Sequence, residues 1–174
     1  RAMEEAMEID KEKALQEMKQ EDPGRMAAIL GASNDFVHDI FNGLDPKLPV
    51  EIANINAEGQ IIIAGRNSAI EYVTGLISQG KVKVLKNISI ASHCSLMEPA
   101  KRMMTKAIDI VDFKTPHIPF ISNVTGKFVT TSEGVRSGLV EQMTGTVQWL
   151  DTMKLIAEEG VDSVVEVGPG VVLT

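Results

Sequence analysis

The order of strand-like and helix-like segments between residues 25 and 87 constrains the fold of this chain more than any other feature of its sequence. Short apolar runs rich in β-branched residues predict strands at 26–30, 50–54, 60–64 and 81–86. Helical spacing of apolar side chains predicts helices at 34–43, which Ser33 can cap, and at 68–79, which Asn67 can cap. The resulting order, β-α-β-β-α-β, is that of a split-βαβ, ferredoxin-like unit.

The rest of the chain has a different order of predicted helices and strands. Predicted helices and strands alternate after this unit, with helices over 95–109, 133–143 and 147–159 and strands over 119–124 and 162–167. Such alternation favours a parallel sheet of the α/β class. We therefore expect a small ferredoxin-like subdomain, residues 22–88, inserted into a larger α/β body. Residues 1–21, which are strong helix formers, and residues 89–174 would belong to that body.

The chain opens directly in this helical pattern at Arg1, with neither a methionine nor a capping residue before it. This start predicts that the sequence is a fragment of a longer protein.

Charge and composition narrow the class of partner. The net charge is −7, and the basic residues are dispersed, so nucleic acid and anionic membrane are poor partners. No apolar run approaches the ~18–20 residues of a membrane span, and no signal peptide is recognisable. The single cysteine, Cys94, excludes an internal disulfide and fits a reducing cytoplasm. One cysteine and three scattered histidines also argue against a zinc site.

Residues 89–97 are the most informative segment for chemistry, because they join a predicted strand to a predicted helix, where α/β folds place ligands. His93 in this segment could act as a general base for a nucleophile, or could be a surface or helix-capping histidine. Cys94 is a poor partner for it, since neighbours in the chain seldom face each other well enough for a dyad. The Gly-rich segment 166–170 lacks the Gly-x-Gly-x-x-Gly pattern, so we interpret it as a rigid turn. Residues 54–60 by themselves indicate only a tight turn.

Six segments, taken together and in order, resemble the malonyl-CoA:acyl-carrier-protein transacylases and the related acyltransferase domains of polyketide synthases. They are Met26–Gly31, Asn54–Gly65, Ser92–Met97, Pro119–Gly126, Leu139–Met143 with Val147–Trp149, and Glu166–Gly170. Each is weak alone, but their common register covers essentially all 174 residues.

This resemblance implies a hydrolase-like α/β body with a ferredoxin-like small subdomain. It implies that His93 is the catalytic histidine, activating a serine that carries the malonyl group from CoA to acyl carrier protein in fatty acid biosynthesis, without a cofactor. Gln142 matches the family's glutamine near the serine–histidine pair, and Asn56 matches an asparagine that faces the substrate cleft. The backbone carbonyl of Val167 or a neighbour is the expected group that orients the histidine.

The chain departs from the family where the nucleophile is concerned. It contains no Gly-x-Ser-x-Gly elbow. The arginine that holds the malonyl carboxylate lies four residues before a methionine matching Met3, so its position falls before Arg1 and Arg1 is not that residue. The glutamine that helps form the oxyanion hole is missing for the same reason. We therefore predict that these residues are inactive alone and require the missing amino-terminal half of the same protein.

Two further interpretations remain open. The chain could be a noncatalytic module that binds acyl carrier protein or CoA, with Lys81, Lys83 and Lys86 as a docking patch for an acidic carrier. These lysines more simply protect an edge strand from pairing.

The segment Ile90–His93 resembles the tetrapeptide that accompanies methylmalonyl choice in some polyketide domains. Ser-His also occurs in free-standing malonyl enzymes, so we expect malonyl to be the acyl group.

Overall fold

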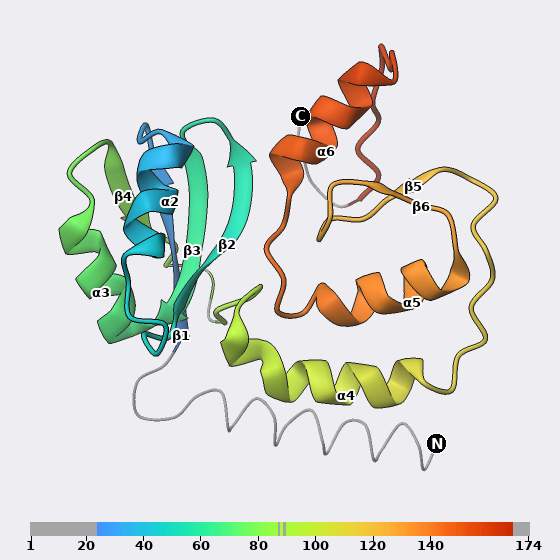
Figure 1. Cartoon of the computed structure of the whole chain (residues 1–174), viewed down its shortest axis with the longest axis horizontal. Helices are drawn as coiled ribbons and strands as arrows, with labels where there is room; N and C mark the ends of the chain where they lie inside the picture. Colours follow the sequence, from blue (N-terminus) through green and yellow to red (C-terminus); the bar gives the residue numbers. More distant parts are fainter. Residues whose placement is uncertain (1–23, 87, 89, 169–174) are drawn as a thin grey trace.

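The computed structural model describes residues 24–86, 88 and 90–168 of the chain (Figure 1). The helix predicted over the first twenty residues, and with it the domain segment 1–21, lies outside the described residues. The described chain forms a four-stranded sheet with two helices, followed by a mainly helical region that carries a small hairpin.

The element order predicted between residues 25 and 87 is confirmed. The strands are β1 (Gly24–Leu30), β2 (Val50–Ala57), β3 (Gln60–Arg66) and β4 (Lys81–Val84), and the helices are α2 (Asn34–Asn42) and α3 (Asn67–Leu76). The strands lie in the order β2-β3-β1-β4, and all neighbouring pairs are antiparallel. Helix α3 ends earlier than predicted, at Leu76, because the backbone of Ile77 is already extended.

Both faces of this sheet are buried, which explains why β1 and β3 are nearly continuous apolar runs rather than alternating ones. Helices α2 and α3 cover one face, as Figure 1 shows. The core on that side includes Ile29, Ile61, Ile63, Val37, Ile70 and Val73. The opposite face, with Met26, Ala28, Ala53, Ile62 and Ala64, packs against Ala91 and Cys94 from the segment that follows β4.

The turn between β2 and β3 is tied to the start of α2. Gly59 has φ +75°, a conformation that glycine adopts without strain, and its N–H donates to Asn34 Oδ1 at 3.1 Å. The Glu58 carboxylate in turn accepts from the Asn34 N–H at 3.1 Å, and Ser33 caps the helix as predicted. The turn is therefore confined to residues 58–59, and Asn56 lies inside strand β2.

The second region begins with a short 3₁₀ helix, η1 (Ser95–Met97). It continues with α4 (Glu98–Ile108), β5 (Phe120–Ile121), β6 (Phe128–Val129), α5 (Ser132–Glu141) and α6 (Trp149–Glu158). The three helices predicted here are confirmed. The region joins the sheet at the outer edge of β2, where Ile55 N–H donates to the Val147 carbonyl at 2.9 Å and Val147 N–H donates to the Ala53 carbonyl at 2.8 Å.

One prediction for this region, the strand at 162–167, is wrong, and the expected parallel sheet is not seen among the described residues. The segment 162–167 is not a strand, and the described part of the region contains no parallel sheet; β5 pairs only with β6, and antiparallel. A strand needs a neighbour for its backbone hydrogen bonds, and the apolar side chains of this segment are instead exposed: Val164, Val165 and Val167. Among the described helices, none has both the length and the apolar character to cross a membrane.

The helix-covered core should dominate stability. Replacing Ile63, which is 0% exposed, with alanine is expected to lower the free energy of unfolding by about 2–5 kcal/mol, because it leaves a cavity between the sheet and its helices. Ile118→Ala provides the matched control, since this side chain is 69% exposed and its loss should change stability by no more than about 0.5 kcal/mol. Urea unfolding measures both, and equal losses would contradict this assignment of the core.

Candidate active site

The segment from Ala91 to Ser95 is anchored on the sheet on both sides of His93. Ala91 and Cys94 are buried against the sheet face opposite the helices, and the Cys94 thiol donates to the Ala91 carbonyl at 3.3 Å. The Ser95 N–H donates to Glu51 Oε1 on β2 at 3.0 Å, which satisfies one of the free N–H groups at the start of η1. These contacts leave His93 little freedom to change its backbone conformation.

His93 has φ +59°, and it is the one non-glycine residue among those described with a positive φ. This left-handed conformation is uncommon for residues with a Cβ and costs roughly 1–2 kcal/mol. Backbone strain of this kind persists only where the surroundings enforce it, and it clusters at functional sites. The anchors at Ala91, Cys94 and Ser95 supply that enforcement.

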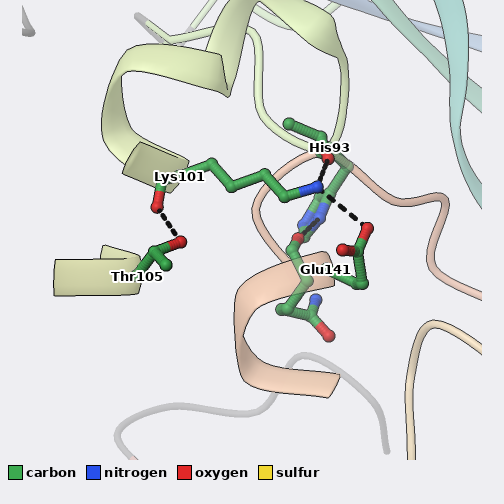
Figure 2. Close-up of polar contacts among 6 residues, drawn as sticks. His93, Lys101, Thr105 and Glu141 are labelled. Atoms are coloured by element: carbon green, nitrogen blue, oxygen red, sulfur yellow. Dashed lines mark hydrogen bonds and ion pairs between the residues drawn. The ribbon is translucent and has the colours of Figure 1, made fainter. Parts of the chain in front are cut away.

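The ring of His93 is oriented by one hydrogen bond. Its Nδ1 lies 3.0 Å from the backbone carbonyl oxygen of Gln142 (Figure 2). A carbonyl only accepts, so Nδ1 must carry the hydrogen, and the neutral ring then has its lone pair on Nε2. This hydrogen bond therefore favours the tautomer in which Nε2 is free to accept a proton.

Gln142 contributes this carbonyl because it follows the last residue of α5. Its own N–H donates to the Gly138 carbonyl at 2.9 Å, as in a continuing helix. Its C=O is one of the carbonyls that a helix end leaves without a partner inside the helix, so it is available to His93. The expectation that the backbone carbonyl of Val167 or a neighbour orients His93 is wrong, because Gln142 supplies the carbonyl at Nδ1. Val167 itself is 93% exposed.

The third predicted residue, Asn56, lies near the end of β2 and is half-buried. The backbone of Asn54, two residues earlier, forms the bridge with Val147. The predicted role of Asn56 toward a substrate stays a prediction.

Sequence reasoning missed the residues that hold the end of α5. Lys101 Nζ on α4 lies 2.9 Å from Glu141 Oε2 and 3.3 Å from Thr144 Oγ1 (Figure 2). Forty residues separate Lys101 from Glu141, and no spacing rule connects positions so far apart. Among the described residues, no group of three or more His, Cys, Asp or Glu side chains could hold a metal ion.

Fold and site together define a protein of mixed α/β class with a strained histidine prepared to accept a proton. Comparisons with known proteins refine this class, although no protein-family model matches the chain. The malonyl CoA-acyl carrier protein transacylase of Haemophilus influenzae is 32% identical over 163 residues, which is 92% of this chain and 52% of that protein. An acyl carrier protein S-malonyltransferase from Vibrio cholerae superposes with a TM-score of 0.80 at 30% identity, covering 89% of this chain and 52% of its own.

A second similar structure is a malonyl-transacylase in complex with its type II polyketide acyl-carrier protein, with a TM-score of 0.78 and 30% identity. It covers 91% of this chain and 53% of that chain. The chain thus spans about half the length of the relatives it matches. These matches confirm the resemblance inferred from its motifs: the chain is similar to the carboxyl-terminal half of malonyl CoA-acyl carrier protein transacylases.

The buried thiol beside His93 gives a test of this packing. Burial is the main cause that raises the pKa of Cys94 from 9.0 to about 11; the Glu51 charge adds to the rise, and a backbone hydrogen bond from Leu96 opposes it. A pKa that is higher in the folded than in the unfolded chain adds stability at low pH that is lost as pH rises from about 9 to about 11. The wild type should therefore lose about 2 kcal/mol of unfolding free energy over this range relative to Cys94→Ala.

Urea unfolding of both proteins across this pH range measures the difference. Only the difference between wild type and variant is informative, because the two proteins share every other ionisable group. A parallel pH dependence of the two proteins would show that the thiol is not buried as described.

Proposed function

We propose that these residues form the base-bearing half of a malonyl-CoA:acyl-carrier-protein transacylase, with His93 as its general base. The single observation that carries the proposal is the hydrogen bond from His93 Nδ1 to the Gln142 carbonyl, made by a residue whose backbone is strained. A left-handed backbone is uncommon for a non-glycine residue and such strain clusters at functional sites, and a catalytic histidine must be held in a fixed tautomer and direction.

The nucleophile would be a serine outside the 174 residues, which contain no Gly-x-Ser-x-Gly segment. His93 Nε2 takes the serine proton as the serine oxygen attacks the malonyl thioester carbonyl. The tetrahedral intermediate collapses to an acyl-enzyme, and the departing CoA sulfur takes the proton from Nε2. The thiol of the carrier's pantetheine arm then gives its proton to Nε2, attacks the ester and leaves with the malonyl group, and the proton returns to serine.

We assign the architecture accordingly. Residues 22–88 would be the ferredoxin-like small subdomain, since their strand order β2-β3-β1-β4 is that of a split-βαβ unit. Residues 1–21 and 89–174 would belong to the hydrolase-like α/β body. The exposed apolar side chains of the second region, among them Ile110, Ile118, Val165 and Val167, support this because a body of twice this length would cover them.

The partners follow from the same proposal. Malonyl-CoA would be the donor and an acyl carrier protein the acceptor, in the cytoplasm, without a cofactor; a similar malonyl-transacylase has been captured with its own carrier protein. Gln142 would support the geometry of His93, and Asn56 would face the substrate cleft.

A noncatalytic module that binds acyl carrier protein is the second candidate. Its support is that Lys81 and Lys83 are exposed on β4, which is an edge strand of the sheet. Lysines also protect sheet edges from pairing with other chains, so this observation is weaker than the geometry at His93. The module would bind a carrier protein equally well after His93→Ala.

Malonyl transfer tests the first candidate. A chimera joining these residues to the part of the Haemophilus influenzae relative that lies outside the match should transfer malonyl from malonyl-CoA to acyl carrier protein. His93→Ala in this chimera should lower kcat/KM by about 10²–10⁴-fold, the usual contribution of a general base. His117→Ala, in an exposed loop, is the matched control and should keep the full rate.

The 174 residues alone should show no transfer, because they lack a serine elbow. Transfer by the isolated chain would place the nucleophile within it, and near-normal rates for His93→Ala in a folded chimera would remove the histidine from the mechanism.

Gln142→Ala should cost less than about tenfold in kcat/KM in the same chimera. The substitution removes the side chain but keeps the backbone carbonyl that accepts from His93. A loss as large as that of His93→Ala, in a variant that keeps its helical circular dichroism, would show that the amide side chain itself takes part in the chemistry.

A further inference from the structure

Lys101 contacts the chain on both sides of the Gln142 carbonyl, which orients His93. Its ammonium contacts Glu141, the residue before Gln142, at 2.9 Å, and Thr144, two residues after it, at 3.3 Å. In Figure 2 the Lys101 side chain extends from α4 toward Glu141. The turn between these contacts is itself closed by the Gly145 N–H, which donates to the Glu141 carbonyl at 2.7 Å. The peptide that presents the Gln142 carbonyl therefore has an external support as well as its own hydrogen bonds.

The environment of Lys101 distinguishes it from a surface ion pair. Its side chain is 19% exposed, whereas Lys154, which pairs with Asp151 on α6, is 60% exposed. The Glu141 carboxylate is 54% exposed, so it is the burial of the lysine end and its part-buried contact with Thr144 that reduce screening by solvent and salt. The positive charge also lies at the carboxyl end of α5, where it offsets the negative end of the helix dipole.

The contacts form a closed ring. His93 is followed by η1 and α4, α4 carries Lys101, Lys101 holds the two residues that flank the α5 turn, and the Gln142 carbonyl returns to His93 Nδ1. Movement at any one contact changes the distance or angle at the imidazole. Lys101 touches neither the imidazole nor a reacting atom in these contacts, so its effect passes through Gln142.

We propose that Lys101 is a positioning residue for His93: by clamping Glu141 and Thr144 it holds the Gln142 carbonyl where it stabilises the Nδ1–H tautomer. This inference rests on the proposed function only in its consequence for catalysis, because the tautomer can be measured without any reaction.

The test measures the His93 tautomer by long-range ¹H–¹⁵N NMR of the histidine-labelled 174-residue chain, with the His93 signals assigned from the His93→Ala spectrum. Wild type should show His93 in the Nδ1–H form. Lys101→Met, which keeps the stem but removes the charge, should shift the tautomer ratio about fivefold toward Nε2–H, the size expected when one neutral hydrogen bond is weakened or lost. Lys101→Arg should restore the wild-type ratio, and Lys154→Met, the matched control, should leave it unchanged.

Glu141→Gln keeps the proposal testable if Lys101→Met unfolds, because it removes the ion pair without changing size, and it should shift the ratio in the same direction. An unchanged ratio in either variant, with the amide spectrum of the sheet preserved, would overturn the proposal. If the tautomer ratio changes but the chimera transfers no malonyl, the positioning role of Lys101 is supported and the proposed function is rejected. If both hold, Lys101→Met should lower kcat in the chimera with little change in KM.

Discussion

The pairing of Val147 with the edge of β2 is the contact on which the candidate site depends. Three hydrogen bonds fix the chain that follows α5 to the sheet. Val147 makes two backbone hydrogen bonds, donating to Ala53 and accepting from Ile55. The Thr146 hydroxyl donates to the Ile52 carbonyl at 2.7 Å. The segment with His93 is fixed to the same sheet, through burial on its face and through the Glu51 carboxylate. Because the sheet locates both segments, the end of α5 and the imidazole meet although 49 residues separate them.

The sheet also stabilises the unfavourable backbone of His93. A left-handed histidine would relax if its neighbours could move, but Ala91 and Cys94 are packed in a closed apolar layer. The free energy gained by that packing offsets a local strain of roughly 1–2 kcal/mol. The packing of the fold therefore fixes the orientation of the His93 ring. A fixed orientation is what catalysis by a general base requires.

Local patterns in the sequence predicted the sheet unit well, because its strands and helices are defined by short-range signals such as apolar runs, Ser33 as a cap and glycine turns. The same signals failed for 162–167, since an apolar run forms a strand only where a neighbouring strand exists, and no described strand lies beside it. His93 could be singled out from its position between a strand and a helix, and from family resemblance. Sequence patterns could not predict three other features: the left-handed backbone of His93, the role of the Gln142 carbonyl and the contacts of Lys101. These features arise from contacts between residues 40 or more positions apart.

The proposed function divides the site, with the general base on the 174 residues and the nucleophile on a part of the enzyme outside them. Intact-mass spectrometry after incubation with malonyl-CoA tests this division most directly, using the 174-residue chain mixed with the separately expressed other half of the Haemophilus influenzae relative. The proposed function predicts a single malonyl adduct on the partner half, formed only when the chain carries His93, and no adduct on the chain itself. A malonyl adduct on the 174 residues, or an equal adduct with His93→Ala, would contradict it.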